Sequence, residues 1–259
     1  MNTRPLIHAA AATHVGRVRA RNEDTVWADP LTGLVAVADG LGGRNAGDMA
    51  SRLAIESLAH ELPKLVSGGL HAPHRLLQHA VALANTKVFT LSTRIPGCVG
   101  MGTTLVAGWF IETAELGRQL VIAHVGDSRL YRYRPQPTST LTLLTRDHSS
   151  AQALVDEGLY TAEAARRLPQ RHMLTRALGV EPDVEIDILT TPVLDHDLVL
   201  LCSDGLSNML GDDELLRMLA IHPTTNEMEL QSLAHTLIEA ANERGGHDNI
   251  SVVLATPAS

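Results

Sequence analysis

Short apolar runs recur along this chain, and they constrain its fold more than any other feature. Each run is rich in Val, Leu and Ile, and each is followed by polar or glycine-containing sequence. Runs of this length and composition are typical of β-strands. The sequence therefore predicts strands at Leu34–Ala38, Thr104–Ile111, Leu120–Val125, Leu130–Tyr133, Val184–Leu189, Leu198–Leu201 and Ile250–Ala255.

Apolar residues at helical spacing predict three helices. Two are consecutive, which favours an antiparallel pair, and the third ends at Gly245-Gly246, a plausible helix stop. Because strands and helices do not alternate one for one, the pattern favours an α+β fold with helices over a largely antiparallel sandwich. The apolar positions are Leu53, Leu58, Leu62 and Leu65; Leu76, Leu77, Ala80, Val81, Ala84, Val88 and Leu91; and Leu230, Leu233, Leu237, Ile238 and Ala241.

The chain is expected to form a single domain over residues 1–259. Its 44% hydrophobic and 19% charged residues are typical of a globular protein, and no repeat or long linker divides the sequence. Between residues 145 and 178 the strand pattern gives way to polar, alanine-rich sequence of helical character. We interpret residues 146–173 as a flap-like insertion beside a site.

Charge and composition exclude several partners. With 21 Lys+Arg against 29 Asp+Glu the net charge is −8, which disfavours nucleic acid and anionic membrane surfaces. The N-terminal apolar stretch is short and interrupted by His8, and Gly97–Ile111 is shorter than the ~20 residues of a membrane helix. Cys98 and Cys202 are too few for a disulfide scaffold. A cytoplasmic protein without an anchor is expected, with Cys202 buried inside a strand.

Carboxylates stand at the ends of four of the apolar runs: Asp39, Asp127, Asp204 and Asp248. Any one of them can simply mark a turn, since Asp-Gly commonly follows a strand. A packed sandwich, however, brings strand ends to shared edges, where several carboxylates repel one another unless cations neutralise them. An all-oxygen ligand set suits magnesium or manganese, and two adjacent ions activate a bridging water for attack on phosphorus.

Eight ordered segments extend this pattern over almost the whole chain, from about residue 10 to 255. Together they resemble the motif series of the metal-dependent type 2C (PPM) serine/threonine protein phosphatases, bacterial branch. The resemblance implies a four-layer αββα sandwich, in which two mostly antiparallel sheets are flanked by helices. The segments are Arg19–Asp24, Asp39–Gly43, Gly100–Thr104, Gly126–Arg129, Asp147–Ser149, Leu174–Gly179, Cys202–Gly205 and Gly246–Asn249.

The resemblance also implies a dinuclear site of manganese or magnesium at one end of the sheets. Asp39 would bridge both ions. Asp204 and Asp248 would complete the shell of one ion, while the carbonyl of Gly40 and, directly or through water, Glu23 would serve the other.

Further residues match supporting roles in the same family. Asp127, with Asp204, matches a third, weaker metal position. Arg19 matches the arginine that grips the substrate phosphate, a task that suits the fork of a guanidinium group. We expect Asp24 and Asn249 to orient ligands and metal-bound waters; strand capping is the alternative role for both.

The sequence departs from the family at the proton donor. Leu41 stands where eukaryotic members carry a histidine, and Arg44 stands where many bacterial relatives carry one. His148 lies in a segment that is structural in the family, so the general acid is unassigned. The remaining histidines show no spacing that ties them to the acids and are expected at the surface.

The leading hypothesis is hydrolysis of phosphoserine and phosphothreonine in proteins by a metal-activated water. The resemblance adds an opposing bacterial Ser/Thr kinase as partner, and a monomer is assumed. Nucleotide binding by the glycine-rich loop after residue 39 is disfavoured, because Asn45 stands where the phosphate-binding pattern needs glycine. A non-catalytic phosphoprotein-binding domain is the other alternative, and loss of a metal carboxylate would be its signature.

Overall fold

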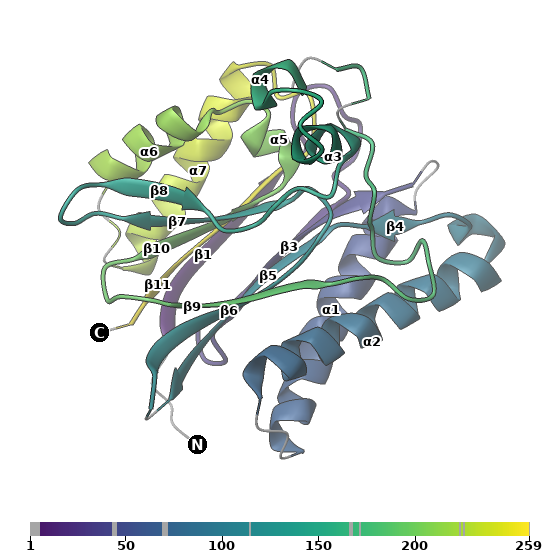
Figure 1. Ribbon diagram of the computed structural model, residues 1–259, viewed down its shortest axis with the longest axis horizontal. Helices are drawn as coiled ribbons and strands as arrows, with labels where there is room; N and C mark the ends of the chain where they lie inside the picture. Colours follow the sequence, from purple (N-terminus) through teal and green to yellow (C-terminus); the bar gives the residue numbers. More distant parts are fainter. Residues whose placement is uncertain are drawn as a thin grey trace.

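Two antiparallel sheets stack face to face in the computed structural model, with helices on each outer side (Figure 1). The structure describes residues 6–42, 46–68, 72–113, 115–165, 168–170, 172–222, 224 and 226–258. This is the predicted four-layer αββα sandwich. The first sheet has the order β1-β11-β10-β7-β8 and the second β2-β3-β5-β6-β9, with β4 paired to β3.

The strands of the first sheet are β1 (Ile7–His14), β11 (Ile250–Pro257), β10 (Leu198–Cys202), β7 (Arg129–Arg134) and β8 (Thr140–Leu143). Those of the second sheet are β2 (Asp24–Asp29), β3 (Leu34–Leu41), β5 (Leu105–Thr113), β6 (Gly117–Val125), β9 (Asp187–Pro192) and the short β4 (Gly102–Thr103). All of these strand pairings are antiparallel.

The central strands are apolar throughout because both of their faces are buried. In β3, Leu34, Ala36 and Ala38 face the helices, while Val35 and Val37 face the other sheet. Successive side chains of a strand point to opposite faces, so one continuous apolar run supplies two cores. This explains why these strands lack the alternation of polar and apolar residues that a half-exposed strand shows.

Helices cover both outer faces (Figure 1). The predicted pair, α1 (Gly47–Ser67) and α2 (Pro73–Arg94), packs on the second sheet, and α7 (Glu227–Glu243) packs on the first. A further helix, α6 (Asp212–Ile221), joins the layer of α7 through Leu215 and Leu219. The short segments are η1 (Pro96–Cys98), α3 (Ser150–Asp156), α4 (Ala162–Ala165) and α5 (Asp204–Ser207).

The segment predicted as a flap contains α3 and α4, which lie near α5 at one end of the sandwich (Figure 1). Cys202 is buried in β10, as expected, and its burial raises the pKa of the thiol to about 12. No helix among the described residues is long and apolar enough to cross a membrane.

Several sequence predictions need correction. The N-terminal apolar stretch is strand β1, paired with β11 along its whole length, and β2, β8 and α6 were not predicted as separate elements. The strand expected at Val184–Leu189 begins three residues later, at Asp187.

Candidate metal centre

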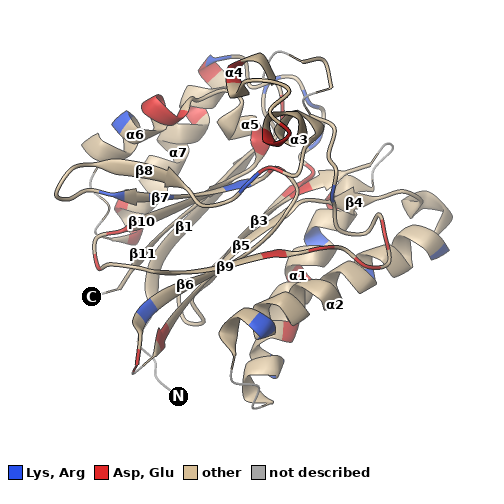
Figure 2. Ribbon diagram, viewed as in Figure 1, with Lys and Arg blue, Asp and Glu red and all other residues tan. Residues whose placement is uncertain are grey.

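Antiparallel pairing within each sheet and the stacking of the two sheets bring the carboxyl ends of β3, β6 and β10 together with the starts of β2 and β11. An open cavity of about 640 Å³ lies at this end of the sandwich. In Figure 2, acidic segments gather beside α5 and at the end of β3. Every sequence-predicted site residue except Asp24 lines the cavity: Arg19, Glu23, Asp39, Gly40, Asp127, Asp204, Asp248 and Asn249.

Asp39 is held at the end of β3 by its backbone. Its N–H donates to the Thr104 side chain (2.9 Å), and its carbonyl accepts from the Thr104 N–H (2.9 Å). Asp24 lies opposite Asp39 in the register of β2 and β3, buried behind the cavity. The Ser203 hydroxyl donates to one Asp24 carboxylate oxygen (2.8 Å), while the other oxygen has no hydrogen bond in the described part of the chain.

Asp204 and Asp248 are brought together by a close backbone contact. Asp204 follows β10 and Asp248 precedes β11, which are neighbouring antiparallel strands. A Cβ atom at Gly205 would lie 1.9 Å from the carbonyl oxygen of Asn249, so only glycine permits this approach. Asn208 donates to one oxygen of Asp204 (3.1 Å), and the other oxygen is buried without a partner among the described residues.

Arg19 lies at the mouth of the cavity with its side chain 54% exposed. Its guanidinium donates to Asp248 at 2.7 Å, and this hydrogen bond raises the pKa of Arg19. The pairing holds the guanidinium over the acidic cluster while leaving much of it accessible. A guanidinium group has five N–H donors, and the hydrogen bond to Asp248 uses one of them. The others are therefore available for an anionic ligand.

Asn249 orients the chain around Glu23. Its side-chain oxygen accepts from the Glu23 N–H (2.8 Å), and its amide donates to the carbonyls of Val15 (3.0 Å) and Arg21 (2.8 Å). The Ser51 hydroxyl donates to the Glu23 carbonyl (2.6 Å). Asn249 is buried, and these bonds to backbone groups use both ends of its amide, so it holds the segment that carries Glu23 in place.

The clustered carboxylates oppose one another's ionisation. Burial raises the pKa of Asp39 well above its ordinary value, and Asp24, Asp204, Asp127 and Asp248 raise it further. Burial and then Asp204 do the same for Asp127, and burial raises the pKa of Asp24 to about 7. The pKa of Glu23 is also raised, again mainly by burial. Without a cation, this group therefore retains protons that a set of solvated carboxylates would lose.

These residues fit divalent cations of the hard type. The predicted metal ligands offer carboxylate and backbone oxygens to the cavity, and a buried Asp204 oxygen has no protein partner among the described residues. A cation would favour the charged form of each carboxylate and would remove the repulsion that raises their pKa values.

The cavity also holds residues that sequence reasoning missed. His172 and His247 are exposed, as expected, but both line the cavity, and His172 Nδ1 lies 3.7 Å from a carboxylate oxygen of Asp204. Leu41 lines the cavity and carries no proton for a leaving group, while Arg44 lies outside the described residues. The expectation of a surface position is wrong for His124, which is only 2% exposed.

A family model described as "Protein phosphatase 2C" matches residues 17–240. The chain belongs to the protein phosphatase 2C family. It is 40% identical over 250 residues to the serine/threonine protein phosphatase PstP of Mycobacterium tuberculosis, covering 96% of this chain and 45% of PstP. It is 38% identical over 253 residues to the serine/threonine phosphatase Stp of Listeria monocytogenes, covering 96% of this chain and 95% of the relative.

Solved structures show the same fold. The crystal structure of the M. tuberculosis phosphatase PstP superposes with a TM-score of 0.84 at 39% identity, covering 98% of this chain and 99% of that one. A structure of the PstP catalytic domain in complex with two manganese ions gives a TM-score of 0.79 at 37% identity, covering 98% and 99%. The chain thus spans about half the length of PstP and matches its catalytic domain.

Proposed function

We propose that this chain hydrolyses phosphoserine and phosphothreonine in proteins, using two manganese or magnesium ions. The observation that carries the proposal is the gathering of Asp39, Asp204 and Asp248 in one cavity, where their carboxylate oxygens fit divalent cations. Bound there, two such ions lower the pKa of a water and orient it for attack on phosphorus. Membership in the family and the manganese in the PstP catalytic domain support the same assignment.

The proposal assigns a role to each residue of the metal centre. Asp39 would bridge the two ions, Asp204 and Asp248 would hold one of them, and the Gly40 carbonyl with Glu23 would serve the other. Because these carboxylates repel one another, the cavity favours ions strongly once the pH allows the acids to ionise.

Arg19 binds the phosphoryl group of the substrate. Its guanidinium overhangs Asp248 at the cavity mouth, where phosphoryl oxygens can accept from its remaining N–H groups. Leu41 supplies no proton to the leaving serine or threonine oxygen. A loose phosphoryl-transfer transition state depends mainly on positioning and charge stabilisation, so this step does not demand a histidine at that position.

The proposed substrates are phosphorylated proteins, and a Ser/Thr kinase that modifies the same proteins is the expected opposing partner. The chain is expected to act as a monomer. The non-catalytic alternative would be marked by a lost metal carboxylate, and Asp39, Asp204 and Asp248 are all present at the cavity. Asp127, with Asp204, is proposed to hold a third, weaker ion.

Asp39→Asn tests the bridging role. The amide keeps the shape of the side chain but removes the negative charge shared by both ions, so turnover and tight manganese binding should be lost together. Phosphate release and calorimetric titration with manganese measure the two effects. The exposed His79→Asn variant on α2 is the control and should match the unmodified protein. Turnover retained by Asp39→Asn would show that Asp39 does not bridge the ions.

A further inference from the structure

Asp127 sits on a tight turn between β6 and β7, and the backbone of that turn is fixed by Gly126. Gly126 has φ +108°, and a Cβ atom there would lie 2.6 Å from the Thr104 side chain. The Ser128 hydroxyl lies 2.7 Å from that of Thr104, which also accepts from the Asp39 N–H. The position of the Asp127 carboxylate therefore depends on the groups that hold this turn.

His148 holds Gly126 at both of its backbone polar groups. The His148 N–H donates to the Gly126 carbonyl (2.7 Å), and the Gly126 N–H donates to His148 Nδ1 (3.1 Å). The neighbouring Asp147 binds Arg129, the residue after the turn, through two contacts of 2.9 and 2.7 Å. The dipeptide Asp147-His148 thus clamps both ends of the turn.

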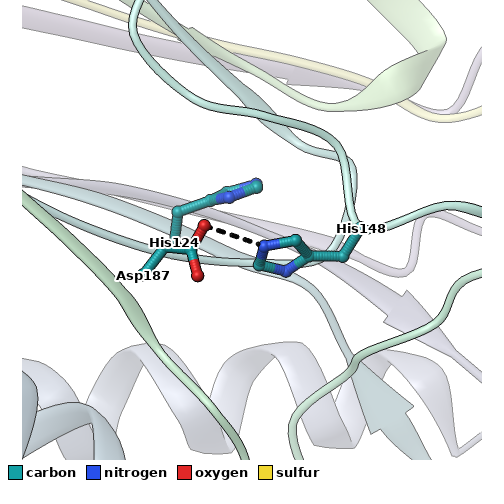
Figure 3. A group of neighbouring side chains, drawn as sticks. All are labelled: His124, His148 and Asp187. Atoms are coloured by element: carbon teal, nitrogen blue, oxygen red, sulfur yellow. Dashed lines mark hydrogen bonds and ion pairs between the residues drawn. The ribbon is translucent and has the colours of Figure 1, made fainter. Parts of the chain in front are cut away.

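The clamp fixes the tautomer of His148. Since Nδ1 accepts an N–H, it carries no proton, and the neutral ring must carry its proton on Nε2. Nε2 lies 3.1 Å from a carboxylate oxygen of Asp187, to which it donates (Figure 3). The other Asp187 oxygen accepts from Arg176 (2.9 Å), which follows the flap-like segment in the chain. Asp187 and Arg176 therefore orient the ring from the side opposite Gly126.

A metal ion is the obvious alternative occupant of this cluster. One ligand atom each of His124, His148 and Asp187 lies within 4.8 Å of the others, and His124 is buried with no hydrogen bond at either ring nitrogen among the described residues. Two imidazoles and a carboxylate can bind zinc. However, His148 Nε2 could ligate only if its proton were lost or moved to Nδ1, where it would oppose the Gly126 N–H. The cluster therefore fits a positioning role better than a metal site.

We propose that His148, oriented by Asp187 and Arg176, is a positioning residue that holds Gly126 and thereby fixes Asp127 for the third metal position. This inference rests on the proposed function, which gives Asp127 its role. It also connects the segment that follows the flap to the metal centre through a continuous chain of hydrogen bonds, Arg176 to Asp187 to His148 to Gly126.

Two substitutions distinguish the contribution of His148 Nδ1 from that of Nε2. In His148→Asn the amide oxygen takes the place of Nδ1 and can still accept from Gly126, whereas in His148→Gln the amide nitrogen takes the place of Nε2 and the acceptor for Gly126 is lost. We expect His148→Gln to weaken the third manganese about 10–100-fold while leaving two tight ions, as removal of outer-shell partners typically does. His148→Asn should restore most of that affinity.

Calorimetric manganese titration measures this directly, with Asp127→Ala marking the third ion and His79→Asn as the control. Thermal unfolding checks that each variant is folded. Unchanged third-ion affinity in His148→Gln would overturn the proposal. An Asp127→Ala variant that binds as many manganese ions as the unmodified protein would overturn it as well. Phosphate release by the unmodified protein is measured separately and tests the proposed function. If no phosphate is released, the manganese titrations still decide the role of His148.

Nitrogen chemical shifts of the His148 ring in the unmodified protein provide a test that needs no substitution. The proposal predicts a proton on Nε2 and none on Nδ1. A proton on Nδ1 would overturn it. A stoichiometric response of the His124 and His148 resonances to zinc would also overturn it, in favour of the metal site.

Discussion

Replacing His124 by leucine is expected to make the protein less sensitive to acid. His124 lies on β6, is 2% exposed, and packs against the His148 ring, with the ring centroids 4.7 Å apart and the planes tilted by 43°. Burial, and then the neighbouring His148, lower the pKa of His124 from its ordinary 6.5 to about 4, against smaller opposite effects of Asp147 and Asp187. The folded protein therefore binds the proton less readily than the unfolded chain, so stability is lost as the pH falls from 6.5 towards 4.

The size of this loss follows from the two pKa values. At about 1.4 kcal/mol per pKa unit, lowering the pKa from 6.5 to about 4 corresponds to about 3 kcal/mol of unfolding free energy. Leucine has a similar volume and no titrating group, so the difference between His124→Leu and the unmodified protein should grow by this amount between pH 7 and pH 4. At pH 7 the variant should be no less stable, because the two buried ring nitrogens have no partners to lose among the described residues.

Urea denaturation at several pH values, with chelator present, measures the effect. The acidic cluster shifts stability in the opposite direction with pH, but it does so equally in both proteins and cancels in the difference. His79→Asn is the control, since His79 is exposed and should leave the pH dependence unchanged. Parallel pH profiles for His124→Leu and the unmodified protein would refute the reasoning.

Three further substitutions test the site. Arg19→Ala should mainly raise KM in steady-state kinetics, because phosphate binding is lost in ground and transition states alike; an unchanged KM would contradict the contact. Asp24→Asn should stabilise the metal-free protein to urea at pH 8, where the raised pKa of about 7 makes the buried charge costly, and the gain should vanish near pH 4; no gain at pH 8 would disprove it. Gly205→Ala should cost about 1–3 kcal/mol in thermal unfolding, since its Cβ would meet the Asn249 carbonyl; unchanged stability would show that the backbone yields freely.

The fold was predictable where strands carry large β-branched and aliphatic side chains. Strand β1 was missed because alanine has little preference for strands, and Ala9–Ala12 becomes a strand only through pairing with β11 and burial on both faces. Similarly, β9 begins at Asp187, inside the run Val184–Leu189 and three residues after its start, because its register is set by β6. Tertiary pairing decided both cases.

The acidic residues of the site were predictable because each stands at a strand end, and antiparallel pairing collects such ends. Their polar supports were not. Thr104 holds Asp39 from 65 residues away and Ser203 holds Asp24 from 179 away, so neither bond leaves a local signal in the sequence. His124 was missed because it interrupts an apolar run by a single residue, and its burial depends on the strands on either side.

The most direct test of the central claim is the initial rate of phosphate release from a phosphothreonine peptide, measured with manganese, with magnesium and with chelator. The proposed function predicts release with manganese that disappears when chelator removes the ions. Release that persists in chelator would contradict a reaction carried by Asp39, Asp204 and Asp248. Absence of release under every metal from a well-folded sample would favour a phosphoprotein-binding domain instead.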